Sequence, residues 1–158
     1  MNQEENQYIW LLDNILTNGE IRSDRTGVGT IGTFGTQLKF SLENNKIPML
    51  TTKKMFLKGV IEELLFFLRG ETDTKKLEEK GVFIWKGNTS REFLDNRGLD
   101  HLPEGQMGKG YGYQWRKFGA TGNYNPINHN TNEGTDQLLQ VINTLKTNPT
   151  DRRIIMSA

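Results

Sequence analysis

The sequence predicts an α+β protein. Three observations support this class. Apolar residues recur at helical spacing in several stretches, apolar and polar residues alternate in another, and turn residues separate them. Helices mixed with separated strands are typical of α+β folds. No internal repeat or linker divides the chain, so residues 1–158 are expected to belong to one domain.

The first predicted elements are a helix, a loop and a strand. Residues 4–17 repeat apolar side chains at helical spacing, and Gly19 follows as a helix stop. Residues 22–30 form a loop rich in glycine and charge. Residues 31–41 alternate apolar and polar side chains around Gly35, which indicates a strand with a bulge.

Three helices are predicted in the remaining sequence. Residues 56–69 are apolar on most sides, and such a helix is usually buried. A shorter helix is predicted over residues 72–80. An amphipathic helix is predicted over residues 135–146, with Thr135 as N-cap and Asn148 at its end.

The last residues read as the start of a buried strand. Ile154 begins an apolar run directly after Arg152 and Arg153. A buried strand is an unusual place for a chain end. We therefore expect this chain to be the N-terminal portion of a longer protein, and its fold to be incomplete.

Residues 119–134, which are rich in glycine and asparagine, are predicted to be a surface loop.

Composition excludes several classes of protein. The net charge of +1 provides no general attraction to nucleic acid or a membrane. The chain has no cysteine, and His101 and His129 are its two histidines, so no metal site is expected. No apolar run is long enough to span a bilayer, and the acidic N-terminus is no signal peptide. A cytoplasmic protein is expected.

A carboxylate on the apolar helix is the first candidate for chemistry. With about 100° of rotation per residue, Glu63 falls between two phenylalanines and away from the polar flank. Burial favours the neutral form of a carboxyl group, which suits general acid or base catalysis. The alternative is that Glu62, Glu63 or both lie at the helix edge and pair with Lys58 or Arg69.

Three arginines are candidates for binding an anion. Arg25 stands beside Gly27 and Gly29, in a loop that matches neither a dinucleotide-binding motif nor a P-loop. Arg152 and Arg153 precede the predicted strand, where neighbouring side chains point to opposite faces. Guanidinium groups bind phosphate through two parallel hydrogen bonds. An ordinary turn and a solvated strand end are the alternatives.

Several segments together resemble the thymidylate synthase family, in its order and at its spacings. The resemblance covers nearly the whole chain but only a little more than half of a complete enzyme. The segments are Asp24-Arg25-Thr26-Gly27-Val28-Gly29-Thr30 with Phe34-Gly35, Leu50-Thr51-Thr52-Lys53-Lys54, Glu63-Leu64-Leu65-Phe66-Phe67-Leu68, Ile84-Trp85, Tyr111-Gly112-Tyr113-Gln114-Trp115-Arg116-Lys117-Phe118-Gly119 and Asp151-Arg152-Arg153-Ile154-Ile155.

The resemblance implies a homodimeric methyltransferase. The family converts dUMP to dTMP, and 5,10-methylenetetrahydrofolate supplies both the carbon and a hydride. Its large mixed sheet packs against the other subunit. Its nucleophile is a cysteine, which the resemblance places after Ala158 and which this chain lacks. The chain alone is therefore expected to be inactive and not to form the normal dimer.

The resemblance also implies roles for individual residues. Arg25 matches a phosphate-binding arginine on a loop, and Arg152 and Arg153 match two arginines that reach the phosphate across the dimer. Glu63 matches the glutamate that manages protons around the pyrimidine through water. Tyr111 matches a tyrosine in the hydrogen-bond network that removes the ring proton.

Three further residues match the family's folate site. Lys53 matches a lysine near the folate, Trp85 a tryptophan that lines the pocket, and Asn88 falls where another folate-contacting side chain lies. One departure concerns the turn before Tyr111. The family usually has Gly-Pro-apolar there, whereas this chain has Gly108-Lys109-Gly110, which makes the turn more flexible.

Two alternative functions stay open at the level of sequence. The first is a pyrimidine nucleotide hydroxymethylase of the same fold, which differs at a base-reading residue outside this chain. The second is a noncatalytic nucleotide-binding fragment. The reading frame after Ala158 would distinguish all three.

Overall fold

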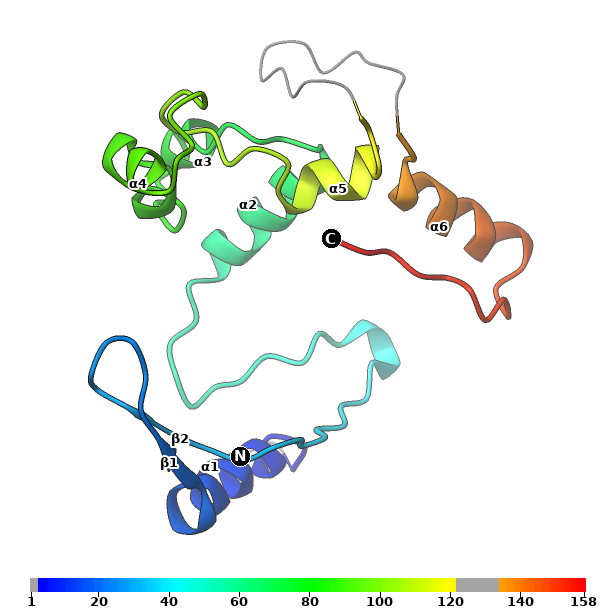
Figure 1. Ribbon diagram of the computed structural model, residues 1–158. Coiled ribbons are helices and arrows are strands. Elements are labelled where there is room, and N and C mark those ends of the chain that lie inside the picture. Colours follow the sequence, from blue (N-terminus) through cyan, green and yellow to red (C-terminus); the bar gives the residue numbers. More distant parts are fainter. Residues whose placement is uncertain (1–2, 122–133) are drawn as a thin grey trace. The chain divides into compact units, whose positions relative to one another are not determined.

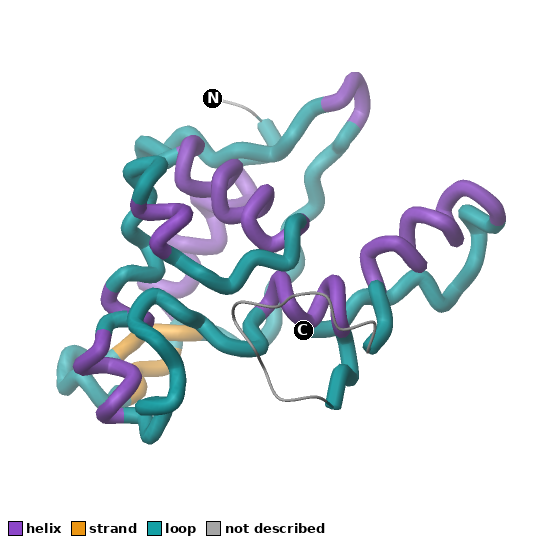
Figure 2. Tube along the Cα trace, turned by 90° about the horizontal axis from the view of Figure 1, so that it is seen from above, coloured by secondary structure: helices purple, strands orange, loops and turns teal. Residues whose placement is uncertain are grey.

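The computed structural model describes residues 3–121 and 134–158. The chain divides into two compact units, Met1–Met55 and Phe56–Ala158. Helices provide most of the regular structure, and the strands of the described residues form one hairpin (Figure 1, Figure 2). The prediction of an α+β fold is confirmed, and the described residues contain an antiparallel hairpin in place of the expected large mixed sheet. The division into units does not test the prediction of one domain.

The first unit consists of a helix, a hairpin and irregular segments. Helix α1, Asn6–Asn18, agrees with the helix predicted over residues 4–17 to within two residues at each end. Strands β1, Glu20–Arg22, and β2, Thr30–Gly32, pair antiparallel with Ile21 opposite Ile31. A short 3-10 helix η1, Glu43–Asn45, follows.

The strand predicted over residues 31–41 is wrong beyond Gly32. A strand needs a neighbour for its backbone N–H and C=O groups, and β1 pairs with only three residues. A side chain replaces that neighbour farther along. The Gln7 amide donates to the Lys39 carbonyl at 2.7 Å and accepts from the Lys39 N–H at 3.0 Å. The alternation of apolar and polar side chains over residues 31–41 was therefore not sufficient to form a strand.

The second unit is built around helix α2, Leu57–Leu68. Phe66 is fully buried and packs with Phe67, Leu77 and Val82 in the core of this unit. Helix α5, Tyr111–Lys117, lies against α2 (Figure 1). Helix α6, Gln137–Thr147, contacts α5 in turn.

Short helices complete this unit. Helix α3, Lys75–Glu78, contacts α2 and is shorter than the helix predicted over residues 72–80. The 3-10 helix η2, Gly87–Thr89, contacts helix α4, Arg91–Asn96. Neither α4 nor α5 was predicted. Ser90 provided a signal for α4, because its hydroxyl caps the helix by accepting from the Phe93 N–H at 3.2 Å.

A glycine allows α2 and α5 to approach closely. A Cβ atom at the buried Gly112 would lie 2.9 Å from both the Cα atom and the carbonyl oxygen of Phe67. Real Cβ contacts are longer, so any side chain at this position would push the helices apart. The bare backbone at Gly112 therefore fixes how Tyr111 is presented beside α2.

The cap of α6 differs from the prediction. Asp136, not Thr135, caps the helix, and its carboxylate accepts from the Leu139 N–H at 3.0 Å. Aspartate is at least as good an N-cap as threonine, and it lies one residue closer to the first helical turn.

The strand predicted after Arg153 is not formed. Arg152 and Arg153 lie in a turn, both exposed, and the following residues have no regular structure. The side chain of Gln137 holds this segment: it donates to the Ser157 carbonyl at 2.8 Å and accepts from the Ser157 N–H at 3.0 Å. No strand of the described residues lies beside it to complete a ladder.

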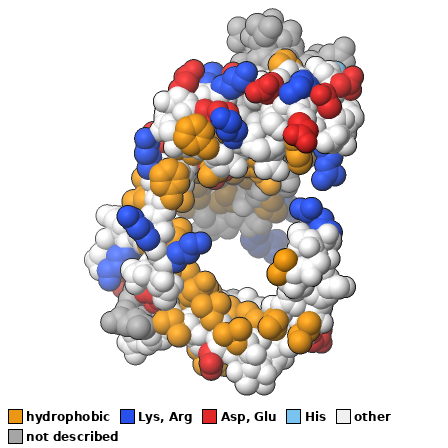
Figure 3. Space-filling view, turned by 90° about the vertical axis from the view of Figure 1, so that its left-hand side faces the viewer, with side chains coloured by type: hydrophobic (Ala, Val, Ile, Leu, Met, Phe, Trp, Pro, Cys, Tyr) orange, Lys and Arg blue, Asp and Glu red, His pale blue; other side chains and the backbone are white. Residues whose placement is uncertain are grey.

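Much apolar surface of α2 is exposed. The helix is covered on the face of Phe66 and Phe67, whereas the prediction was burial on most sides. Figure 3 shows hydrophobic side chains at the surface of the face that it draws. No helix in the described part of the chain is long and apolar enough to cross a membrane. The uncovered residues of α2 are 40–50% exposed: Leu57, Val60, Ile61, Leu64 and Leu65.

Candidate functional site

Helix α2 places a carboxylate against a tryptophan. The Trp85 Nε1–H donates a hydrogen bond of 2.7 Å to Oε1 of Glu63. Both side chains are half-buried. The desolvation predicted for Glu63 is therefore partial, because Phe66 and Phe67 take the fully covered face of the helix. The indole fixes the direction of the carboxylate.

The ring of Phe67 brings the predicted aromatic site residues together. Its centroid lies 5.4 Å from that of Tyr111 and 6.3 Å from that of Trp85. The rings of Trp85 and Tyr111 are themselves 6.1 Å apart. These spacings are typical of packed aromatic pairs. Glu63, Trp85 and Tyr111, which three separate segments provide, thus form one cluster.

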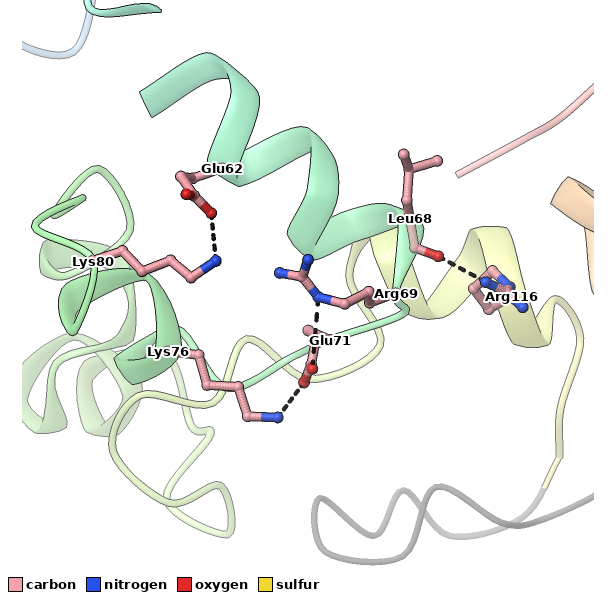
Figure 4. Close-up of polar contacts among 7 residues, drawn as sticks. All are labelled: Glu62, Leu68, Arg69, Glu71, Lys76, Lys80 and Arg116. Carbon is pink, nitrogen blue, oxygen red and sulfur yellow. Dashed lines mark hydrogen bonds and ion pairs between the residues drawn. The ribbon is translucent and has the colours of Figure 1, made fainter. Parts of the chain in front are cut away.

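Glu62 has a different environment from Glu63. Its carboxylate pairs with the ammonium group of Lys80, as Figure 4 shows. The hydrogen bond from Lys80 lowers the pKa of Glu62 below its ordinary value of 4.5, and Arg69 and Lys58 add only weaker attraction. The alternative reading, in which Glu62 forms an ion pair, is therefore confirmed, but its partner is Lys80 and not Lys58 or Arg69. Arg69 instead lies 4.0 Å from Glu71. A paired, ionised carboxylate is poorly suited to proton transfer.

Asn88 follows Trp85 in the same turn. The N–H and the hydroxyl of Thr89 both bond to the Trp85 carbonyl, at 3.1 Å and 3.0 Å. Thr89 is buried, and its hydroxyl also meets that of Thr74 at 2.8 Å. Asn88 itself is exposed. The buried Thr89 therefore holds the backbone of Trp85, while Asn88 stays accessible to solvent.

The loop of Arg25 is organised by its neighbour Asp24. The Asp24 carboxylate accepts from the Thr26 hydroxyl at 2.8 Å, the Thr26 N–H at 3.0 Å and the Gly29 N–H at 3.3 Å. These bonds, with the Thr26 hydroxyl first, lower the pKa of Asp24. Gly27 has φ 77°, which glycine adopts without strain. The loop therefore closes on Asp24 and leaves Arg25 exposed.

Four cationic residues with predicted roles, Arg25, Lys53, Arg152 and Arg153, are exposed and have no anionic partner among the described residues. Within residues 3–121 and 134–158, no ion pair or side-chain hydrogen bond is found for them. Arg25 and Lys53 belong to the first unit and the other two to the second, so their meeting with Glu63 stays a prediction. Each is available to an external anion.

Metal-binding side chains do not cluster in the described ranges. No group of three or more His, Cys, Asp or Glu side chains lies together there in a way that could hold a metal ion. His129 lies outside the described residues, as does most of the predicted loop over residues 119–134.

The family model described as thymidylate synthase matches residues 6–158. The chain belongs to the thymidylate synthase family. It is 57% identical over 159 residues to a probable thymidylate synthase of Schizosaccharomyces pombe, an alignment that covers 99% of this chain and 25% of that protein.

Two further thymidylate synthase relatives show the same pattern. A bifunctional dihydrofolate reductase-thymidylate synthase of Leishmania major is 52% identical, with 99% of this chain and 30% of that protein covered. A thymidylate synthase of Herpesvirus ateles is 52% identical, with 98% of this chain and 52% of that protein covered. The chain thus spans between a quarter and about half of the length of these relatives.

Sequence reasoning missed two residues with notable contacts, one in each unit. Phe67 is the common neighbour of Tyr111 and Trp85, but an apolar residue on a helix is indistinguishable from ordinary core in sequence. Glu5 is a buried carboxylate, and it was read only as part of a polar N-terminus. Neither position carries a local sequence signal, because both roles depend on residues far along the chain.

Proposed function

We propose that the protein to which this chain belongs is a thymidylate synthase that methylates dUMP to dTMP. The observation that carries the proposal is the cluster of Glu63, Trp85 and Tyr111 around Phe67, in a chain of this family. 5,10-Methylenetetrahydrofolate is the proposed co-substrate. It gives up a one-carbon group and a hydride and leaves as dihydrofolate.

Glu63 is the proposed residue for proton management at the pyrimidine. Its carboxylate is half-buried and held by the Trp85 N–H, whereas Glu62 is tied to Lys80. A partly desolvated carboxylate with one fixed hydrogen bond keeps an oxygen free to work through water. Tyr111 stands beside the same aromatic group, with its side chain 49% exposed, and is proposed to belong to the same proton network.

The arginines are proposed to bind the phosphate of dUMP. Arg25, Arg152 and Arg153 are exposed and unpaired in the described chain, as an anion site requires. Charge-assisted bonds from guanidinium to phosphate are among the strongest available. In a homodimer, Arg152 and Arg153 would serve the site of the neighbouring subunit.

Lys53, Trp85 and Asn88 are proposed to bind the folate. The half-buried indole of Trp85 offers an aromatic face for the folate ring. The exposed Lys53 and Asn88 provide a cation and an amide for polar groups. The 158 residues contain no cysteine, so the family's nucleophile is not among them.

The product formed from dUMP tests the proposal. The protein as encoded by its gene would be supplied with dUMP and 5,10-methylenetetrahydrofolate, and the nucleotides would be separated by chromatography. Equal amounts of dTMP and dihydrofolate support the proposal. A hydroxymethylated nucleotide would indicate the hydroxymethylase, and binding of dUMP without any product would indicate a noncatalytic binder. Cytoplasmic location and the homodimer stay predictions.

A further inference from the structure

Glu5 is a buried carboxylate that the proposed mechanism does not use. Its side chain is 3% exposed, and it is the only buried residue among residues 3–55. It stands at the start of α1, where its backbone carbonyl accepts from the Tyr8 N–H at 3.0 Å. A buried carboxylate without partners would be costly, so its contacts indicate what it does.

The Glu5 carboxylate binds two residues far along the chain. Oε1 accepts from the N–H groups of Thr51 and Thr52, the second at 3.0 Å, and Oε2 accepts from the Thr51 hydroxyl at 2.8 Å. These bonds, with the Thr51 hydroxyl first, lower the pKa of Glu5 and keep it ionised at neutral pH. The contact joins the helix start to a segment 46 residues later.

The segment held by Glu5 leads directly to Lys53. Residues 46–56 have no helix or strand, so no backbone ladder fixes their course. Lys53 and Lys54 follow Thr52, and both are exposed. Glu5 directs its charge to the backbone and hydroxyl of the two threonines, and not to the lysines. The ammonium of Lys53 therefore stays available to a ligand.

The surroundings of Glu5 contain few other charges. A cavity of about 200 Å³ beside it is lined by Glu4 and Lys46 and by largely apolar residues between Phe40 and Leu50. Glu4 makes a different contact, because its carboxylate accepts from the Ser41 N–H at 3.0 Å. Of these two neighbouring acids, the one that grips the segment before Lys53 is thus Glu5.

We propose that Glu5 is a positioning residue for the folate site: its carboxylate fixes Thr51 and Thr52, and so aims the Lys53 ammonium at the anionic folate co-substrate. The inference rests on the proposed function, which assigns Lys53 to folate. It predicts that loss of the Glu5 carboxylate acts on folate and not on dUMP.

Steady-state kinetics of the protein as encoded by its gene test this role. Glu5→Ala should raise the KM for methylenetetrahydrofolate about tenfold or more, the scale of a lost hydrogen bond to a charged group. The KM for dUMP should change less than about twofold, within the spread of surface changes. The folate KM of Glu5→Gln should lie between those of the unmodified protein and Glu5→Ala, because the glutamine amide oxygen can still accept from both N–H groups. Glu4→Ala is the matched control and should leave both KM values unchanged.

A double mutant connects the effect to Lys53. Lys53→Ala should raise the folate KM, and Glu5→Ala should add little in its presence, since coupled residues are not additive. Full additivity, an unchanged folate KM in Glu5→Ala, or an equal rise for both substrates would overturn the inference while dTMP formation stands. If Glu5→Ala does not fold, a folate KM in Glu5→Gln equal to the unmodified value overturns it. Failure of the unmodified protein to form dTMP would overturn the proposed function as well.

Discussion

Trp85 and Glu63 are joined by a hydrogen bond of 2.7 Å from the indole N–H to the carboxylate. The bond connects α2 with the turn that precedes η2, 22 residues later in the chain. Trp85, which is proposed to line the folate pocket, thus orients Glu63, which is proposed to manage protons. In the proposed function, this single contact would link the binding of folate to the transfer of protons.

Glu63→Gln should lower turnover far more than Glu62→Gln. The glutamine amide cannot act as a general acid or base near neutral pH. Loss of general acid–base catalysis typically costs about 10²–10⁴-fold in rate. Glu62 is paired with Lys80 on the other side, so its substitution should change turnover only slightly. The kcat for dTMP formation by both variants, with dUMP binding as a check on folding, decides between them. A larger loss in Glu62→Gln would contradict the assignment.

Alanine at Arg25, Arg152 or Arg153 should weaken dUMP binding. Loss of a hydrogen bond to a charged group typically costs about 1.5–3 kcal/mol. Calorimetric titration of the encoded protein with dUMP measures this, and deoxyuridine, which has no phosphate, provides the control because its affinity should not change. Unaltered dUMP affinity in all three single variants would reject the phosphate site.

Gly112→Ala should destabilise the protein. The added methyl group would meet the Phe67 backbone at 2.9 Å, and such overpacking costs about 1–3 kcal/mol. Because the contacted atoms belong to the Phe67 backbone, the cost should lie in the upper part of this range, and the gain in helix propensity, about 1 kcal/mol, offsets only part of it. Gly87→Ala is the control, since its new Cβ meets no atom within 4 Å apart from its chain neighbours and the backbone of its own helix. The free energy of unfolding in urea is the measurement, and equal values for the two variants would contradict the close approach of α2 and α5.

Acid should weaken the loop that carries Arg25. The folded pKa of Asp24 lies below its ordinary value of 3.8 because Thr26 and Gly29 donate to the carboxylate. A lowered folded pKa contributes stability above the unfolded value, and this is lost as the pH falls through the folded value. The difference in unfolding free energy between the unmodified protein and Asp24→Asn should therefore be largest near neutral pH and shrink below about pH 4.

The matched control for this pH dependence is Asp13→Asn. Asp13 is an exposed residue of α1, outside the loop. Its variant should follow the unmodified protein over the whole pH range. A constant difference between Asp24→Asn and the unmodified protein from pH 7 to 3 would contradict the role of the Asp24 carboxylate.

A polypeptide of residues 1–158 alone should form no dTMP. It contains no cysteine, and five apolar residues of α2 are 40–50% exposed, which favours association. Light scattering after size exclusion and a dTMP assay check both expectations, with the encoded protein as the reference. A monodisperse folded species with measurable turnover would refute this prediction.

The longest helices, α1, α2 and α6, were predictable because their signal is local, whereas the shorter α4 and α5 were not predicted. The apolar repeat of residues 56–69 predicted α2, and that of residues 135–146 predicted α6, each within two residues. Strands depend on a partner elsewhere in the chain. The alternating pattern of residues 31–41 was therefore a poor guide, since Gln7 supplied the bonds that a neighbouring strand would have made.

The candidate site shows the same division. Glu63 could be chosen over Glu62 from the helical repeat, because side-chain direction on a helix follows from spacing. The bond from Trp85 could not be derived, because it depends on how the turn after Val82 packs against α2. Glu5 carried no signal at all, since its partners are 46 and 47 residues away.

The ionised centre of residues 3–55 has a calorimetric consequence. The heat capacity of unfolding rises with newly exposed apolar area and falls with exposed polar area. Among residues 3–55 the one buried side chain is that of Glu5. Local opening of the structure around Glu5 should therefore change the heat capacity very little. The free energy of that opening should then vary almost linearly with temperature. Cooling weakens structures that an apolar core stabilises, but it should not release Thr51 and Thr52 from Glu5 in this way.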